Sequence, residues 1–411
     1  MPILLEEDLQ RPLPRMYRVR QQFDETRLED VAGTVRAELA KPEIRALVKP
    51  GMRIAVGVGS RGIQNLYTIV ETTVNSLKEL GAEPFIVSAM GSHGGGTEEG
   101  QREVLAGYGI TEERLGVPVV TTVDTVYLGN CANGRPVWFD RAAYEADLIV
   151  PINRVKLHTD FVGPIQSGLC KMLVIGLGNH KGCSAVHEEA PEVFADAIEE
   201  TARLILQKAP VGFGIAILEN AYDKTYAVEA VPAEHLVERE KGLVQIAKGN
   251  MPYIMLDEAD VIVCGAIGKD ISGAGFDPNI LGRSSVLKQF VLHIPRYQRL
   301  VLCDVTPASH GNGIGVGLFD VITKKVAEQL DLESMYANAI ACNCLGDASV
   351  PCTVDDEETA IRVALKCCRN IDRDHPRIIR IQNTLHLGEI EVSEALLDAV
   401  RADSRMSLIE N

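Results

Sequence analysis

The feature that most constrains the fold is a repeated alternation between short apolar segments and segments with helical spacing. Residues 53–59, 84–90 and 146–151 are rich in Val, Ile and Ala, as buried strands are. Residues 65–80, between the first two, place apolar side chains on one helical face. This order is typical of parallel strands covered by helices, and it predicts an α/β fold.

A second set of strand-like segments follows at 260–265 and 300–304. The chain has 411 residues, which exceeds what one hydrophobic core usually serves. We therefore expect two domains, each with a mostly parallel sheet covered by helices, and an active site in the cleft between them. The expected division is a cofactor-binding catalytic domain at 1–255, joined by 376–411, and a second domain at 256–375 that closes the cleft.

The net charge of −16 restricts the classes of partner. Proteins that hold nucleic acid through its phosphates need many Lys and Arg contacts, so we expect no nucleic-acid partner. The acidic start of the chain lacks the basic and apolar regions of a signal peptide, and no apolar run reaches the roughly 18 residues that span a bilayer. We expect a cytoplasmic protein with no membrane partner, and the sequence leaves a homo-oligomer open.

The ten cysteines are scattered along the chain. In a long chain without export signals we expect reduced thiols. The one cluster lacks the paired CxxC spacing of a zinc site, and we interpret its members as buried small apolar side chains. The cluster comprises Cys342, Cys344, Cys352, Cys367 and Cys368.

Histidines are concentrated in one stretch of the chain, and histidine is suited both to proton transfer near neutral pH and to metal binding. His93 lies in the loop Gly91-Ser-His-Gly-Gly-Gly96, where missing side chains and free N–H groups let a ligand approach the backbone. His158 follows the predicted strand at 146–151. For both residues the alternative is an exposed histidine in a loop.

Lys171 is a single lysine among apolar residues and glycines at 166–178. Burial would favour its neutral amine and make it a nucleophile or a covalent anchor. The alternative is a side chain that reaches the surface. His180 and His187 are seven residues apart, but glycines oppose a helix before about residue 183. His187 then begins a helical run, and a metal ligand there is possible but not required by the pattern.

Several candidates directly follow predicted strands, as ligand-binding residues of open α/β sheets do. Ser60 and Arg61 follow the first strand and could hold a phosphate or carboxylate, and His310 lies in a glycine-rich loop of the second domain. A P-loop, an HExxH motif, a GxSxG elbow and a clean GxGxxG are all absent from the sequence. Simple dinucleotide binding is therefore not favoured.

This constellation resembles the nickel-pincer lactate racemase family, whose members carry nickel in a pyridinium-3,5-bisthiocarboxylic acid mononucleotide attached to the protein. In that family a lysine in a glycine-rich segment forms a thioamide with the cofactor, and a histidine sixteen residues later binds the nickel. Lys171 and His187 have this separation, with Gly176 and Lys181 in register between them. The resemblance implies that Lys171 is the anchor and that His187, rather than His180, is the metal ligand.

The resemblance extends over most of the chain and implies further roles. The family's two acid/base histidines lie in a loop after the second strand and shortly before the anchoring lysine, which matches His93 and His158. Arg61 matches an arginine that helps to hold the cofactor phosphate, and Ser60 and Gly91 belong to the same cofactor-binding loops.

The chain also departs from the family pattern. His158 precedes Lys171 by thirteen residues, three more than in the lactate enzyme, and Cys170 stands where an arginine precedes the lysine. A second-domain lysine that holds the substrate has no obvious counterpart. The candidate substrate contacts in its place are Arg283, Arg296 and His310.

The function that the resemblance implies is that of an isomerase, a racemase or epimerase of a 2-hydroxy acid. One histidine removes the hydroxyl proton while the C2 hydride passes to the pincer ring, and the second histidine serves as acid when the hydride returns to the other face. Inversion requires acid/base groups on both faces. Two alternatives stay open: a pincer-free metal-dependent hydrolase or lyase, and a non-catalytic nucleotide- or metal-binding protein.

Overall fold

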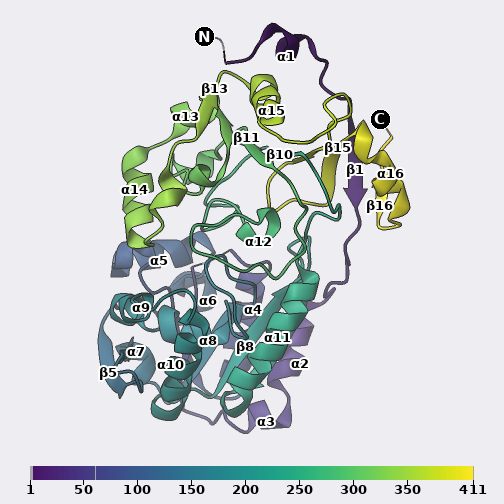
Figure 1. Ribbon diagram of the computed structural model, residues 1–411. Helices are drawn as coiled ribbons and strands as arrows, with labels where there is room; N and C mark the ends of the chain where they lie inside the picture. Colours follow the sequence, from purple (N-terminus) through teal and green to yellow (C-terminus); the bar gives the residue numbers. More distant parts are fainter. Residues whose placement is uncertain (1–2, 61, 411) are drawn as a thin grey trace. The chain divides into compact units, whose positions relative to one another are not determined.

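The computed structural model describes residues 3–60 and 62–410, which form two compact units. One unit spans Glu25–Met251, and the other combines Met1–Asp24 with Pro252–Asn411. Each unit contains a sheet that is mostly parallel and covered by helices, so the predicted α/β class is confirmed (Figure 1). None of the described helices has the length and hydrophobicity needed to cross a membrane.

The unit of residues 25–251 is built on a sheet with the strand order β4-β3-β2-β7-β8-β9. All neighbours are parallel except β8 and β9. The strands are β2 (Arg53–Val58), β3 (Glu83–Ser88), β4 (Val119–Val120), β7 (Leu148–Arg154), β8 (Phe213–Glu219) and β9 (Thr225–Pro232), and a separate hairpin joins β5 (Thr125–Asn130) to β6 (Pro136–Asp140). The longer helices are α2 (Val31–Leu39), α4 (Leu66–Glu79), α5 (Glu98–Gly107), α9 (Asn179–His187), α10 (Phe194–Lys208) and α11 (Leu236–Asn250). The short ones are α3 (Pro42–Arg45), α6 (Glu112–Leu115), α7 (Arg141–Tyr144) and α8 (Leu169–Lys171).

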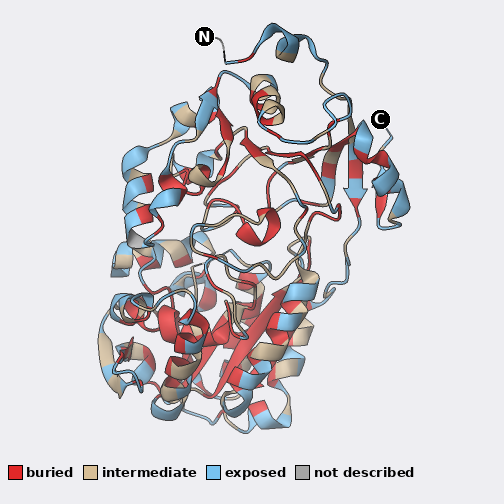
Figure 2. Cartoon of the chain, in the orientation of Figure 1, coloured by how far each residue is buried: buried red, intermediate tan, exposed pale blue. Residues whose placement is uncertain are grey.

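Helices on both faces explain why the central strands are apolar without alternation. Ile54, Ala55 and Val56 are consecutive in β2, point to opposite faces, and are all fully buried. Helix α4 buries Ile69 and Val74 of its predicted apolar face in the same core. Figure 2 shows strands of this unit in red among helices whose outer faces are tan or pale blue. The carboxyl ends of the strands are thereby fixed by a rigid core.

The second unit has the sheet order β13-β12-β11-β10-β14-β15-β1-β16, parallel from β13 to β14 and antiparallel beyond. Its strands are β1 (Met16–Gln21), β10 (Val261–Cys264), β11 (Arg299–Leu302), β12 (Val321–Thr323), β13 (Cys352–Val354), β14 (Ile378–Ile381), β15 (Glu389–Ser393) and β16 (Met406–Leu408). Its helices are α1 (Glu6–Gln10), α12 (Pro278–Leu281), α13 (Lys324–Gln329), α14 (Leu332–Ala341), α15 (Glu357–Lys366) and α16 (Leu397–Ala402).

The expected return of residues 376–411 to the first domain is wrong. Strand β14 pairs in parallel with β10, and β15 then pairs with both β14 and β1, so these residues complete the second sheet. Residues 1–24, which we also expected in the first domain, belong to the same unit because β1 lies in that sheet. A strand-like run in the sequence identifies a strand but not its partner, since pairing is decided by long-range packing.

The clustered cysteines follow the prediction only in part. Cys344 and Cys368 are buried, whereas Cys342, Cys352 and Cys367 are exposed. All of the cysteines are free thiols, as expected. The cluster is therefore not a uniform set of core residues.

Candidate active site

Three loops follow the neighbouring strands β3, β2 and β7 at one edge of the first sheet, where parallel strands bring their carboxyl ends together. Ser60 follows β2, His93 lies in the loop after β3, and His158 follows β7. Ser60 Oγ forms a short hydrogen bond with His93 Nδ1. The Tyr108 hydroxyl donates to the Ser60 carbonyl at 2.8 Å and fixes this loop. Two of the predicted site residues, Ser60 and His93, are thus in contact.

The loop that carries His93 is shaped by glycine. Gly91 has φ +61°, a left-handed conformation that favours glycine, and a Cβ at this position would lie 2.9 Å from the Ile175 carbonyl oxygen. The Gly91 N–H donates to the Gly176 carbonyl at 3.0 Å. The buried Gln101 side chain donates to the Gly91 carbonyl at 3.1 Å. The predicted cofactor-binding residues Gly91 and Gly176 therefore connect the His93 loop to the segment that carries Lys171.

Lys171 ends α8 and is followed by a π-helical turn at Met172–Gly176. Such turns are rare and are frequent at functional sites. The Lys171 Nζ atom lies 2.5 Å from His158 Nε2, so the predicted anchor and one predicted acid/base histidine are in direct contact. The thirteen-residue separation, the departure noted in the sequence, does not prevent this contact.

A buried carboxyl group holds the beginning of the Lys171 helix. Glu240 of α11 accepts a 2.8 Å hydrogen bond from the Cys170 N–H, and burial raises the pKa of this carboxyl to about 7. The Cys170 thiol also lies against Glu240, and burial raises the thiol pKa. Gly168 makes room for this arrangement, because a Cβ there would lie 2.5 Å from the Glu240 carboxyl carbon. The Cys170 side chain is therefore directed into the core.

Sequence reasoning missed Glu240. In the sequence it is one charged residue among several in an amphipathic helix, and nothing local distinguishes it from the exposed Glu238. Its full burial becomes visible only when α11 packs against α8.

His187 is the last residue of α9, and its hydrogen bond fixes the tautomer. Its Nδ1 atom lies 2.7 Å from the Cys183 carbonyl oxygen, which can only accept, so Nδ1 carries the proton. The Nε2 lone pair is then the one that can bind a metal ion. Contact with the Cys183 thiol raises the pKa of His187, an effect opposed by burial.

A row of aromatic rings connects two of the predicted histidines and was not predicted from the sequence. The His158 ring stacks on Phe161 with centroids 4.2 Å apart, and Phe161 contacts Phe194 at 4.9 Å. Phe194 in turn packs against His187 in an edge-to-face arrangement, with ring centroids 5.1 Å apart. Phe161 and Phe194 are buried and hold the two imidazole rings from the core side.

The remaining candidates of this unit are less informative. Arg61 lies outside the described residues. His180 is exposed on α9, and Lys181 lies over the Trp138 ring, 4.9 Å from its centroid. Among residues 3–60 and 62–410, no three His, Cys, Asp or Glu side chains are grouped so that they could hold a metal ion.

In the second unit, the candidate arginines do not lie at the same sheet edge as His310. His310 follows the carboxyl end of β11. Arg283 binds Asp320 at 2.6 Å, and Asp320 accepts from the N–H of Leu300, near the amino end of β11. Arg296 precedes β11 and pairs with Glu258, which precedes β10.

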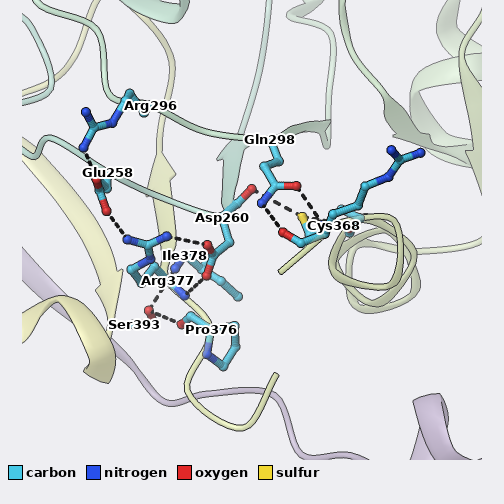
Figure 3. A network of polar contacts seen from close by, with 11 residues as sticks. Glu258, Asp260, Arg296, Gln298, Cys368, Pro376, Arg377, Ile378 and Ser393 are labelled. Carbon is cyan, nitrogen blue, oxygen red and sulfur yellow. Dashed lines mark hydrogen bonds and ion pairs between the residues drawn. The ribbon is translucent and has the colours of Figure 1, made fainter. Parts of the chain in front are cut away.

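Figure 3 shows Arg296 in a network of ion pairs. Arg296 and Arg377 both bind Glu258, and Arg377 also donates to the buried Asp260 at 2.8 Å. Because ligands of open α/β sheets bind beyond the carboxyl ends of the strands, the positions of Arg283 and Arg296 favour a structural role for both.

Comparison with known proteins adds to this geometry. Residues 11–196 match the family model of the lactate racemase N-terminal domain, which confirms the resemblance over that part of the chain. The fold is similar to that of the lactate racemase apoprotein from Thermoanaerobacterium thermosaccharolyticum, with a TM-score of 0.56 and 13% identity over 89% of this chain and 93% of that one. A Thermotoga maritima protein matches with a TM-score of 0.47 and 13% identity over 66% of this chain and 70% of that one. No curated protein matches the sequence.

Proposed function

We propose that this chain, whose residues 11–196 match the lactate racemase N-terminal domain, racemises or epimerises a 2-hydroxy acid with a nickel-pincer nucleotide tethered to Lys171. The observation that carries the proposal is the 2.5 Å contact between Lys171 and His158. It joins the amine that would anchor the cofactor to a histidine that would act on the substrate.

The side chains of this unit fit the proposed cofactor. Lys171 offers an amine for covalent attachment, and His187 offers a neutral Nε2 lone pair because its Nδ1–H is bound to the Cys183 carbonyl. Ser60 and the Gly91 loop lie at the strand ends, where α/β sheets bind nucleotides. When bound, the nickel-pincer nucleotide supplies a reversible hydride acceptor.

The acid/base chemistry falls to His93 and His158, which come from loops after two different strands, β3 and β7. One imidazole takes the hydroxyl proton of the substrate and the other returns a proton, which allows inversion at the neighbouring carbon. The contact of Ser60 Oγ with Nδ1 orients the His93 ring. The stacked Phe161 ring orients His158 and excludes water from one of its faces.

The proposal is tested by measuring the intact mass and nickel content of chain produced together with the cofactor-making enzymes. We expect a mass adduct and stoichiometric nickel in the wild type and in Lys181→Ala, and neither in Lys171→Ala. Racemisation of a panel of 2-hydroxy acids by the loaded chain then identifies the substrate. Absence of adduct and nickel from the wild type would favour a pincer-free hydrolase or lyase, or a binding protein.

A further inference from the structure

The contact between Lys171 and His158 also indicates the protonation state of the lysine. A hydrogen bond between the two nitrogen atoms, 2.5 Å apart, needs one donor and one acceptor. A lysine ammonium carries only donors, whereas an uncharged amine has a lone pair that accepts. The direction of this bond therefore reports whether Lys171 is charged in this arrangement.

The backbone at Asp160 decides that direction. The Asp160 N–H donates to His158 Nδ1 at 3.1 Å, and a backbone N–H can only donate, so Nδ1 must accept. A neutral imidazole that accepts at Nδ1 carries its proton on Nε2. His158 is therefore the donor in its contact with Lys171, and the Lys171 amine is the acceptor. The lysine in this arrangement is uncharged.

The surroundings of the pair support the same assignment. The His158 side chain is 15% exposed and stacks on the buried Phe161. Its backbone N–H donates to Gln166 at 2.7 Å, which fixes the loop. On the lysine side, Glu240 holds the start of α8 through the Cys170 N–H. Both partners are thus held in place by residues outside the pair.

We propose that His158 holds Lys171 as an uncharged nucleophile, so that the unloaded chain acylates itself at this amine. His158 then has a role before any substrate binds, in addition to acid/base chemistry. The identity of the natural acyl group, a pyridine thiocarboxyl group, rests on the proposed function. The reactivity of Lys171 rests on the hydrogen bonds alone.

The reaction balances without an oxidant or reductant. The Lys171 nitrogen forms a bond to the acyl carbon, and the bond from that carbon to its leaving group breaks. His158 Nε2 gives its proton to the leaving group and takes one proton from the attacking nitrogen, so the histidine ends as it began. With a thioester the leaving group is a thiol and the product an amide, whereas a thiocarboxyl group loses water and leaves a thioamide.

The test uses the chain produced without the cofactor-making enzymes and a simple probe, the S-methyl thioester of pyridine-3-carboxylic acid. Labelling of each lysine at neutral pH is followed by peptide mass spectrometry, after hydroxylamine has removed label from cysteines. We expect Lys171 to react on the order of a hundredfold faster than the exposed Lys181. Equal rates at the two lysines would overturn the proposal.

Two matched variants assign the effect to His158. His158→Phe keeps an aromatic ring against Phe161 but removes the donor, and it should reduce Lys171 labelling to the level of Lys181. His180→Phe makes the same change at an exposed histidine of α9 and should leave labelling unchanged. Undiminished labelling in a folded His158→Phe chain, shown by its circular dichroism, would contradict the assigned role.

These outcomes are separate from those of the proposed function. Suppose that Lys171 reacts with the thioester, but that the chain gains no mass adduct when it is produced together with the cofactor-making enzymes. The nucleophilic Lys171 would then be supported, and the proposed pincer cofactor would be contradicted. If the chain instead gains the mass adduct but the thioester does not label Lys171 selectively, the proposed cofactor would be supported and the proposed self-acylation contradicted.

Discussion

The imidazole ring of His158 stacks on the phenyl ring of Phe161, with centroids 4.2 Å apart and ring planes 29° apart. Phe161 is almost fully buried, so this contact ties the orientation of a proposed catalytic side chain to the hydrophobic core. The same ring contacts Phe194, which touches His187. Packing of two phenylalanines therefore holds both the proposed acid/base group and the proposed metal ligand.

Phe161→Leu should slow turnover by the loaded chain on the order of tenfold, because leucine fills the core but cannot fix the imidazole plane. Its stability should fall by less than about 1.5 kcal/mol, as volume-conserving core changes do. Racemisation rates and urea unfolding measure the two effects. Phe139→Leu, at a fully buried position of β6, is the control and should lower stability without changing turnover. A parallel loss of turnover in both variants would contradict a specific role for Phe161.

Removal of the proposed metal ligand separates metal binding from cofactor attachment. His187→Ala should retain the Lys171-dependent mass adduct but lose most of the nickel, since the backbone carbonyl of Cys183 fixes the Nδ1 proton of His187 and directs the Nε2 lone pair to the metal. His180→Ala should retain both. Elemental analysis measures the nickel and intact mass measures the adduct in the same samples. Loss of nickel from His180→Ala, and not from His187→Ala, would identify His180 as the ligand.

The pKa of Glu240 makes a prediction about stability and pH. Burial raises this pKa from its ordinary 4.5 to about 7, so between these values the folded chain holds a proton that the unfolded chain has lost. The contribution of this carboxyl group to the free energy of unfolding is greatest below pH 4.5. It decreases as the pH rises to 7 and is constant at higher pH. In Glu240→Gln this loss is absent.

The free energy of unfolding of Glu240→Gln, taken relative to that of the wild type, should therefore rise by about 2 kcal/mol from pH 5 to pH 8. Urea unfolding at each pH measures this difference. Glu238→Gln on the same helix is the control. Its carboxyl is exposed, and its pKa is lowered by Arg203, so its effect should not change over this range. A Glu240→Gln effect that is equally constant would show that Glu240 titrates normally.

Two glycines of the His93 loop allow strain and close contact to be compared. Gly91 and Gly95 have similar φ values of +61° and +67°, but only at Gly91 would a Cβ meet another atom, the Ile175 oxygen at 2.9 Å. Gly95→Ala should cost about 1 kcal/mol for its conformation, and Gly91→Ala at least about 1 kcal/mol more for the contact. Thermal unfolding tests this difference, and equal costs would mean that the loop yields freely at Gly91.

The position of Arg296 predicts that its replacement has little effect on stability or on substrate binding. Its side chain is 80% exposed and pairs with Glu258, so Arg296→Ala should change stability by no more than about 0.5 kcal/mol. The KM for the substrate should not change, because this arginine precedes β11 instead of following it. A large rise in KM would return Arg296 to the substrate site.

Much of the candidate site could be located from the sequence because its residues follow strands that are recognisable there. Strands β2, β3 and β7 lie close to the predicted segments, and parallel neighbours bring Ser60, His93 and His158 to one edge. The residues that support the site were not predictable. Glu240, Phe161 and Phe194 reach it by packing between elements distant in sequence, and a single buried position carries no local pattern.

The sequence by itself determined the α/β class, through uninterrupted apolar strands, and the spacing of Lys171 and His187, which is a property of the chain alone. Only the tertiary structure decided that residues 376–411 complete the second sheet, that Arg283 and Arg296 bind carboxylates at its amino end, and that Lys171 meets His158. The reason is physical: local composition sets which element forms, whereas partners are chosen by the burial of surfaces that lie far apart along the chain.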